Sequence, residues 1–520
     1  MKGHGEAGAP PASSGTPEAA PPGPAGPTPP GAAPAPGSVR DTGVRAVGGA
    51  AMLVARATVV LVLGLGANVA LARLLEPRDF GLVALGTVLV VFGTVLSDAG
   101  LGAGLIRRPE APARDELQAV SAAQLALTLA LVACAGLVAL PVGRDGFVVA
   151  LMAASLPITM LKVPSVIVLE RGLEYRPIAT VDVIEAVAFY VWALVTVALG
   201  AGVWGFASAV LARAVVGVAA MARVGPVGIL APRWSWARVR PVLGFGARFQ
   251  VPSLVALVRD QALNVGIAVI AGIATLGVWN LAWRVLQVPF MLFGTFGRVG
   301  FPAMARIVNA GHDPRPVIER GGAALAVLSG ATMVALVSFA PALPVLLGDG
   351  WGDVPAVLLW AGVTLIAHFP VMLGSSPYLF ASDAGGTVVK AVLLGAAVWL
   401  GVALPLLPEL GAPAAAVGWC AGALVQLSFL ASRTAARSGA AMVTTVGVPV
   451  AIGVVAAAGG WLVADAAGDG VAAGLLGLAA GEAVLFAALL ALSRPAVRDT
   501  RGLVGEAIGS LVARKVPTQS

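Results

Sequence analysis

Ionisable side chains at membrane depth are the residues of this sequence that could carry chemistry. Two long apolar stretches, 243–271 and 274–300, hold Arg259, Asp260 and Arg284 within their length. An ionisable group at that depth costs several kcal/mol unless it faces other protein groups or water. The sequence therefore predicts a polar interior inside the helical bundle that these stretches form, and the function is expected there.

Three more basic side chains lie inside apolar stretches, namely Arg56, Lys162 and Arg213. Each could contact a substrate, form an internal salt bridge or extend to the membrane surface. The acidic candidates at similar depth are Asp98, Asp182, Glu185, Asp260 and Glu482. Carboxylates at that depth could bind a coupling Na⁺ or H⁺, and for Asp98 and Asp260 the alternative of neutralising a nearby arginine is equally open.

The composition is that of a polytopic membrane protein. Of the 520 residues, 58% are hydrophobic and 11% are charged, against roughly 25% charged in soluble proteins, and the mean hydropathy is +0.92. The net charge of +7 does not indicate nucleic-acid binding, because the basic residues occupy short loops between apolar runs. Cys134 and Cys420 lie in apolar segments and the three histidines are scattered, so no disulfide, metal or other cofactor is expected.

Apolar segments long enough to cross a membrane predict an all-α polytopic protein with about fourteen transmembrane helices. The segments are 47–73, 80–105, 117–141, 147–169, 177–199, 203–223, 243–271, 274–300, 317–340, 354–381, 387–407, 411–432, 443–465 and 470–493. A short pattern at Phe80–Leu85 recurs six helices later at Leu276–Leu281. The recurrence predicts two six-helix lobes related as a parallel pseudo-repeat, with two extra C-terminal helices.

Six domains or segments follow from this pattern. They are a disordered Pro/Ala/Gly-rich tail, an N-terminal lobe, an interfacial linker, a C-terminal lobe, helices 13 and 14, and a second tail, at 1–44, 45–230, 231–242, 243–438, 439–494 and 495–520. Alternate loops carry sixteen Lys and Arg residues on one side of the membrane against three, Arg73, Arg78 and Arg144, on the other. By the positive-inside rule the rich side is cytoplasmic. We therefore expect a plasma-membrane protein with both termini in the cytoplasm.

Several landmarks stand in a recognisable order along the chain. They are 72–82 (ARLLEPRDFGL), 96–108 (LSDAGLGAGLIRR), 169–176 (LERGLEYR), 276–284 (LGVWNLAWR), 297–306 (GRVGFPAMAR) and 347–351 (LGDGW). In this order they resemble bacterial polysaccharide flippases of the MOP exporter superfamily, in the branch that exports colanic or teichuronic acid-type repeat units. The resemblance implies a transporter, not an enzyme. Such a protein flips undecaprenyl-diphosphate-linked oligosaccharides from the cytoplasmic to the outer leaflet for cell-surface polysaccharide biosynthesis.

In that superfamily, helices 1, 2, 7 and 8 line a central cavity that opens alternately to each side of the membrane. The resemblance therefore implies that Arg56, Arg259 and Arg284 contact the substrate diphosphate, with Lys162 and Arg213 as further cationic candidates. Arginine suits the task because its charge persists at low dielectric and its planar fork pairs with phosphate oxygens.

Trp283, next to Arg284, could stack on a sugar of the same substrate. Membrane lipids are expected partners, as are the polysaccharide polymerase and glycosyltransferases of the same pathway. Two alternatives stay open, a multidrug or cation antiporter of the same superfamily and a membrane-embedded glycosyltransferase or polymerase. The excess of buried arginine argues against a cation as substrate, and outward loops of only a few residues argue against the enzyme.

Overall fold

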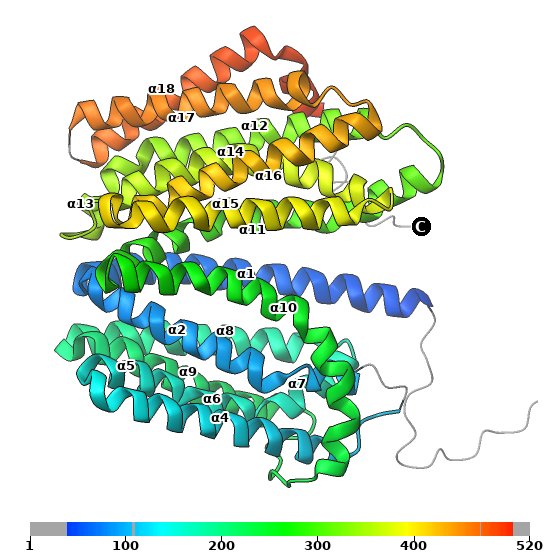
Figure 1. The fold of residues 1–520 in the computed structure, drawn as a ribbon, viewed down its shortest axis with the longest axis vertical. Helices are drawn as coiled ribbons and strands as arrows, with labels where there is room; N and C mark the ends of the chain where they lie inside the picture. The colour runs from blue at the N-terminus through cyan, green and yellow to red at the C-terminus, as the bar shows by residue number, and fades with distance from the viewer. Residues whose placement is uncertain (1–38, 107–109, 469, 503–520) are drawn as a thin grey trace, which may run out of the picture. The chain divides into compact units, whose positions relative to one another are not determined.

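The computed structural model describes residues 39–106, 110–468 and 470–502. Within these ranges the side chains of residues 39–55, 103, 244–253, 255–256, 259–260, 295 and 297–299 lie outside the description. Residues 48–520 form one unit, and the contacts described below lie within it. Its described residues form helices and turns with no strand, which confirms the all-α prediction for that part of the chain (Figure 1).

The first half of the chain contains nine helices among its described residues. They are α1 (Val39–Leu74), α2 (Pro77–Asp98), α3 (Leu101–Ile106), α4 (Arg114–Val142), α5 (Arg144–Ala153), α6 (Ser155–Met160), α7 (Val163–Arg171), α8 (Tyr175–Thr196) and α9 (Gly202–Val224). A π-turn at Val197–Ala201 connects α8 to α9, and a 51° bend separates α6 from α7.

The second half begins with two long helices. These are α10 (Trp236–Ile270) and α11 (Ile273–Asn309). They are followed by α12 (Arg315–Phe339), α13 (Leu343–Leu347), α14 (Val354–Ala381), α15 (Gly385–Leu410), α16 (Ala412–Ser438), α17 (Val448–Ala467) and α18 (Val471–Leu492).

Each predicted apolar segment coincides with one helix or with consecutive helices, but the number of spans is a separate question. Eleven helical stretches among the described residues are long and apolar enough to cross a membrane, or twelve if the bent pair at 144–171 is one span. One of the eleven is a 50-residue stretch, Tyr175–Val224, that contains both α8 and α9. The count of fourteen, like the division into domains, therefore stays a prediction.

Two sets of helices pack within themselves. In the first set α2, α4, α5, α6, α8 and α9 contact one another, and in the second α12, α14, α15, α16, α17 and α18 do so. Helix α11 packs against both α2 and α14, and α10 contacts both α2 and α15. Helices α10 and α11 therefore link the two sets, as Figure 1 shows in green between the blue and the yellow helices.

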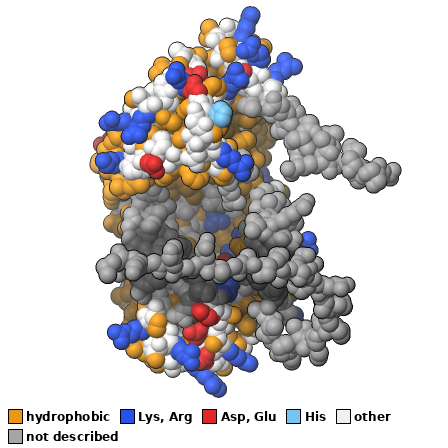
Figure 2. Space-filling model, turned by 90° about the vertical axis from the view of Figure 1, so that its right-hand side faces the viewer, with side chains coloured by type: hydrophobic (Ala, Val, Ile, Leu, Met, Phe, Trp, Pro, Cys, Tyr) orange, Lys and Arg blue, Asp and Glu red, His pale blue; other side chains and the backbone are white. Residues whose placement is uncertain are grey.

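Ion pairs join loops that the charge count assigned to the same side of the membrane. Arg238, at the start of α10, pairs with Asp115 at the start of α4 at 2.5 Å. At the other end of the helices Arg78 pairs with Asp145, also at 2.5 Å. Figure 2 shows that Lys and Arg side chains gather on the face where α10 begins. The membrane orientation itself remains a prediction.

Helices α2 and α11 approach each other closely at two glycines. A Cβ atom at Gly81 of α2 would overlap the carbonyl oxygen of Ile273, and one at Gly277 of α11 would overlap the carbonyl oxygen of Pro77. Each glycine thus lies against the carbonyl oxygen of the residue that stands four positions, or one helical turn, before the glycine of the other helix. The two occupy matching positions of the repeated sequence pattern, so this crossing has a local two-fold arrangement.

A tryptophan from the second half is inserted beside this crossing. Trp351 is fully buried, and its indole N–H donates to the carbonyl oxygen of Ala72 at 3.0 Å. Its ring lies edge-on to Phe80 with 5.1 Å between the ring centroids. Arg73 donates to the carbonyl oxygens of Val345 and Leu346 at 3.1 and 2.6 Å. The two halves of the chain are therefore held together at this end of the helices.

Candidate functional site

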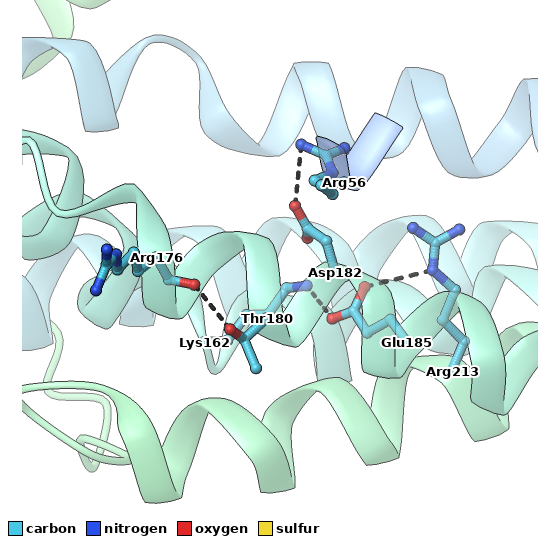
Figure 3. Close-up of polar contacts among 7 residues, drawn as sticks. All are labelled: Arg56, Lys162, Arg176, Thr180, Asp182, Glu185 and Arg213. Carbon is cyan, nitrogen blue, oxygen red and sulfur yellow. Dashed lines mark hydrogen bonds and ion pairs between the residues drawn. The ribbon is translucent and has the colours of Figure 1, made fainter. Parts of the chain in front are cut away.

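A cluster of five charged side chains lies among α1, α8, α9 and the α6–α7 bend, and we call it the Glu185 cluster (Figure 3). Its members are Arg56, Lys162, Asp182, Glu185 and Arg213. Helix α8 supplies both acidic members, which stand three residues apart and so share one helical face. The cluster brings together three of the residues predicted to contact a substrate.

Glu185 is the centre of this cluster. Its side chain is 4% exposed, and its two carboxylate oxygens contact Lys162 Nζ and Arg213 Nε, the latter at 3.4 Å. The carboxylate lies where a Cβ atom at Gly217 would be, so only glycine at that position of α9 leaves room for it. Lys162 reaches Glu185 because it stands at the bend between α6 and α7, where the helix is interrupted.

Arg56 pairs with the other carboxylate of the cluster. Its Nη1 lies 3.2 Å from Asp182 Oδ2, and the two side chains are 37% and 25% exposed. Arg56, Lys162 and Arg213 therefore form internal salt bridges, which is one of the three alternatives that the sequence left open for them. Asp182 and Glu185 balance two of their three positive charges, and the structure adds no support for direct substrate contact by these three residues.

Replacing Glu185 by glutamine is expected to destabilise the protein by about 2 kcal/mol. The change removes the carboxylate that contacts Lys162 in a mostly buried site, while the half-exposed Arg213 can turn to water, which keeps the cost below that of a fully buried pair. The thermal unfolding midpoint of the purified protein measures the effect. Asp115→Asn, which removes the exposed partner of Arg238, is the matched control and should change the midpoint little.

Arg284 occupies a different environment between the two halves of the chain. From α11 its Nη1 donates to Asn68 Oδ1 of α1 at 2.8 Å, and its guanidinium lies 5.9 Å from the ring centroid of Phe206 of α9. Asn68 is buried and donates in turn to the carbonyl oxygen of Gly64. Among the described residues no carboxylate contacts Arg284. Its charge is therefore uncompensated within that part of the chain.

Trp283 turns away from Arg284 into a group of aromatic rings. Its ring stacks on Trp279 with centroids 5.8 Å apart and contacts Trp419 of α16 at 5.5 Å. The side chain also lines a cavity within the second half of the chain. The predicted contact of Trp283 with a sugar stays a prediction.

Asp98 ends α2 without a basic partner among the described residues. Its Oδ1 accepts from the backbone N–H of Gly102 at 3.3 Å and from Nε2 of Gln124 at 3.4 Å. Charge pairing with an arginine therefore has no support here, while ion coupling stays untested. The side chains of Arg259 and Asp260 lie outside the described residues, so their predicted roles stay predictions.

Metal binding has no support in the described part of the chain. No group of three or more His, Cys, Asp or Glu side chains is placed there to hold a metal ion. Cys134 and Cys420 are both free thiols.

A family model described as polysaccharide biosynthesis protein matches residues 70–356, which is more than half of the chain. The chain belongs to the polysaccharide biosynthesis protein family. This polysaccharide biosynthesis protein is also 25% identical over 318 residues to the lipopolysaccharide biosynthesis protein WzxC of Escherichia coli (strain K12). The match covers 58% of the chain and 63% of WzxC, so the chain spans less than two thirds of that relative's length.

Two solved structures share the fold of this polysaccharide biosynthesis protein. The lipid II flippase MurJ, in an inward closed conformation, superposes with a TM-score of 0.62 over 85% of this chain and 98% of MurJ, at 12% identity. An inward-facing multidrug resistance MATE family transporter of the MOP superfamily gives 0.52 over 75% and 98%, at 18% identity. The chain therefore shares the fold of these two proteins, and its long apolar helices are those of a multi-pass membrane protein. Both fold relatives are named for transport, in agreement with the expectation that the chain is not an enzyme.

Proposed function

We propose that this protein flips an undecaprenyl-diphosphate-linked oligosaccharide from the cytoplasmic to the outer leaflet of the plasma membrane. The observation that carries the proposal is the uncompensated cation at Arg284. A buried charge is costly unless a counter-charge or hydrogen bonds satisfy it, and Asn68 is a neutral partner that satisfies one of the five N–H donors of the guanidinium. A diphosphate would supply the missing charge and accept two parallel hydrogen bonds from the planar guanidinium.

The position of Arg284 supports alternating access as the mechanism. The residue lies on α11, which packs against both helix sets, and its side chain reaches Asn68 of α1 and Phe206 of α9. Movement of one set against the other would change what the guanidinium faces, and so would expose a bound head group to each side in turn. The lipid tail would stay in the bilayer. Coupling to Na⁺ or H⁺ through Asp98 or Asp260 is part of the proposal, as are a polymerase and glycosyltransferases as partners.

Flipping in proteoliposomes tests this function. A fluorescent polyprenyl diphosphate oligosaccharide is incorporated in both leaflets, and a membrane-impermeant glycosidase then removes the sugar from the outer leaflet. We expect complete digestion with the protein present and about half without it. Digestion that stops at half with folded protein, together with uptake of a cationic dye such as ethidium, would instead identify a cation exporter.

A further inference from the structure

A cavity of about 550 Å³ lies within the second half of the chain and is lined by residues of α10, α11, α14, α15 and α16. Cavities of roughly 300–1,000 Å³ are the size class that binds small ligands in proteins. The proposed function uses Arg284, which points to α1 and α9 and does not line this cavity. A volume of this size inside a packed helix set therefore needs its own explanation.

Aromatic rings form a continuous wall along one side of the cavity. The wall consists of Trp279, Trp283, Phe290, Trp399 and Trp419. Trp399 is fixed by a hydrogen bond from its indole N–H to the carbonyl oxygen of Ala415 at 2.9 Å, and its ring stacks on Trp419 at 5.7 Å. Rings that are held by one another in this way present a rigid apolar surface to a ligand.

Neutral amides face the same cavity. They are Gln261, Asn264, Asn280, Gln287 and Gln426. Asn264 donates to Gln261 at 2.8 Å, Asn280 donates to the carbonyl oxygen of Leu276 at 3.0 Å, and Gln426 contacts only the weak acceptor Met372 Sδ at 3.3 Å. Each side-chain amide has two donors and an acceptor oxygen with two lone pairs, so most of this hydrogen-bonding capacity is unused within the described residues.

Among the residues whose side chains the structure describes, those that line the cavity include no Asp, Glu, Lys or Arg, and His368 is the one titratable group. Nδ1 of His368 is buried and has no hydrogen-bond partner among the described residues. A diphosphate would lack a counter-charge in this cavity, and an organic cation would lack a carboxylate in a site of low dielectric. The lining instead suits a neutral ligand that has flat apolar faces and a rim of groups that both donate and accept hydrogen bonds.

We propose that this cavity, the aromatic-amide pocket, binds a neutral pyranose of the oligosaccharide that the protein transports. A pyranose ring presents C–H groups on its faces, which pack on indole rings, and hydroxyls at its rim, which pair with side-chain amides. The proposal rests on the proposed function, since it assigns a second subsite to the same substrate. It adds that uncharged sugar units, and not only the diphosphate, are recognised.

The pocket is connected to the cation by the geometry of α11. Asn280, Arg284 and Gln287 are spaced four and three residues apart, so they form one stripe on the helix surface with neighbours one turn apart. Asn280 and Gln287 line the pocket, while Arg284 between them turns toward Asn68. A diphosphate at Arg284 and the first sugar at the edge of the pocket would then be as close as their covalent linkage requires.

Binding of two lipids to the purified full-length protein tests the proposal. The probes are a polyprenyl diphosphate and the same lipid carrying a neutral hexose trisaccharide, measured by microscale thermophoresis in detergent. We expect the trisaccharide lipid to bind wild type about tenfold more tightly, the contribution typical of one buried aromatic anchor. Trp283→Leu should remove that preference and leave the sugar-free lipid unaffected, whereas Arg284→Gln should weaken both lipids equally.

Two further variants keep the test decisive. Gln287→Leu changes an exposed amide at the edge of the pocket, so it should fold normally and reduce the preference for the trisaccharide lipid. Trp360→Leu, an exposed tryptophan of α14 outside the pocket, should change neither affinity. Equal binding of both lipids by wild type would overturn the pocket assignment and leave the flippase proposal intact. Binding of neither lipid, with tetraphenylphosphonium bound in a Trp283-dependent manner, would overturn both.

Discussion

Replacing Arg284 by glutamine is expected to slow flipping of the lipid-linked oligosaccharide about a hundredfold, because two charge-assisted hydrogen bonds to the diphosphate are lost. Glutamine keeps most of the length of the side chain and can still contact Asn68, so the loss reports on charge and on the forked geometry. Arg284→Lys, which keeps the charge but not the fork, should retain an intermediate rate. The digestion rate in proteoliposomes measures each variant.

The stability of the same variant provides a second readout. Because Arg284 has no counter-charge among the described residues, its removal should leave the thermal unfolding midpoint unchanged or raise it. Arg223→Gln, at the exposed end of α9, is the matched control and should alter neither rate nor midpoint. A wild-type flipping rate for Arg284→Gln would remove this residue from the mechanism, and a large fall in the midpoint would show that its role is structural.

Replacing Gly81 by alanine is expected to abolish transport and to open the contact between α2 and α11. The new methyl group would collide with the carbonyl oxygen of Ile273, a backbone atom that cannot turn aside, so the two helices must separate. Gly277→Ala should have the same effect through the carbonyl oxygen of Pro77. Matching effects at both positions would reflect the two-fold arrangement of the crossing.

Thiol labelling follows this opening directly. Ile273→Cys places a thiol on α11 at the crossing, against Gly81, in a protein whose two native cysteines have been replaced by alanine. A membrane-impermeant maleimide should label it faster in the Gly81→Ala variant than in the parent. Gly66→Ala on α1, where a Cβ atom meets nothing within 4 Å, should label at the parental rate. Unchanged labelling and transport in Gly81→Ala would show that the crossing is not needed for function.

The positions of the helices were predictable from the sequence because the length of an apolar run is set by the thickness of the membrane. The interruptions of these helices could not be predicted from the sequence. The bend before Lys162 and the π-turn at Val197–Ala201 fall inside or between apolar runs, where hydropathy carries no signal. For the same reason the number of spans depends on how bent or merged helices are counted.

The charged members of the site were found from the sequence, but their partners were not. Glu185 stands 23 residues from Lys162 and 28 from Arg213, and Arg284 is 216 residues from Asn68. Which side chains meet across such separations depends on helix packing, which a single sequence does not encode locally. The basic residues of the Glu185 cluster form internal salt bridges, whereas Arg284 pairs with the neutral side chain of Asn68.

The amides of the pocket were missed for another reason. A search for charged residues at membrane depth does not detect uncharged polar side chains. Their spacing did hold a signal, because Gln261 and Asn264 share one face of α10, as Asn280 and Gln287 share one face of α11. Polar residues repeated at helical spacing within an apolar segment would have indicated a polar surface facing the protein interior.

The crossing of Gly81 and Gly277 also determines what comparison of related sequences could reveal. Spatial contacts are usually inferred when two positions change together, because one side chain compensates for a change in the other. Here each glycine contacts main-chain atoms, which are the same in every residue type, so no substitution at one position can compensate for a change at the other. We therefore expect the closest approach between α2 and α11 to leave no covariation signal, with each glycine kept independently of the other.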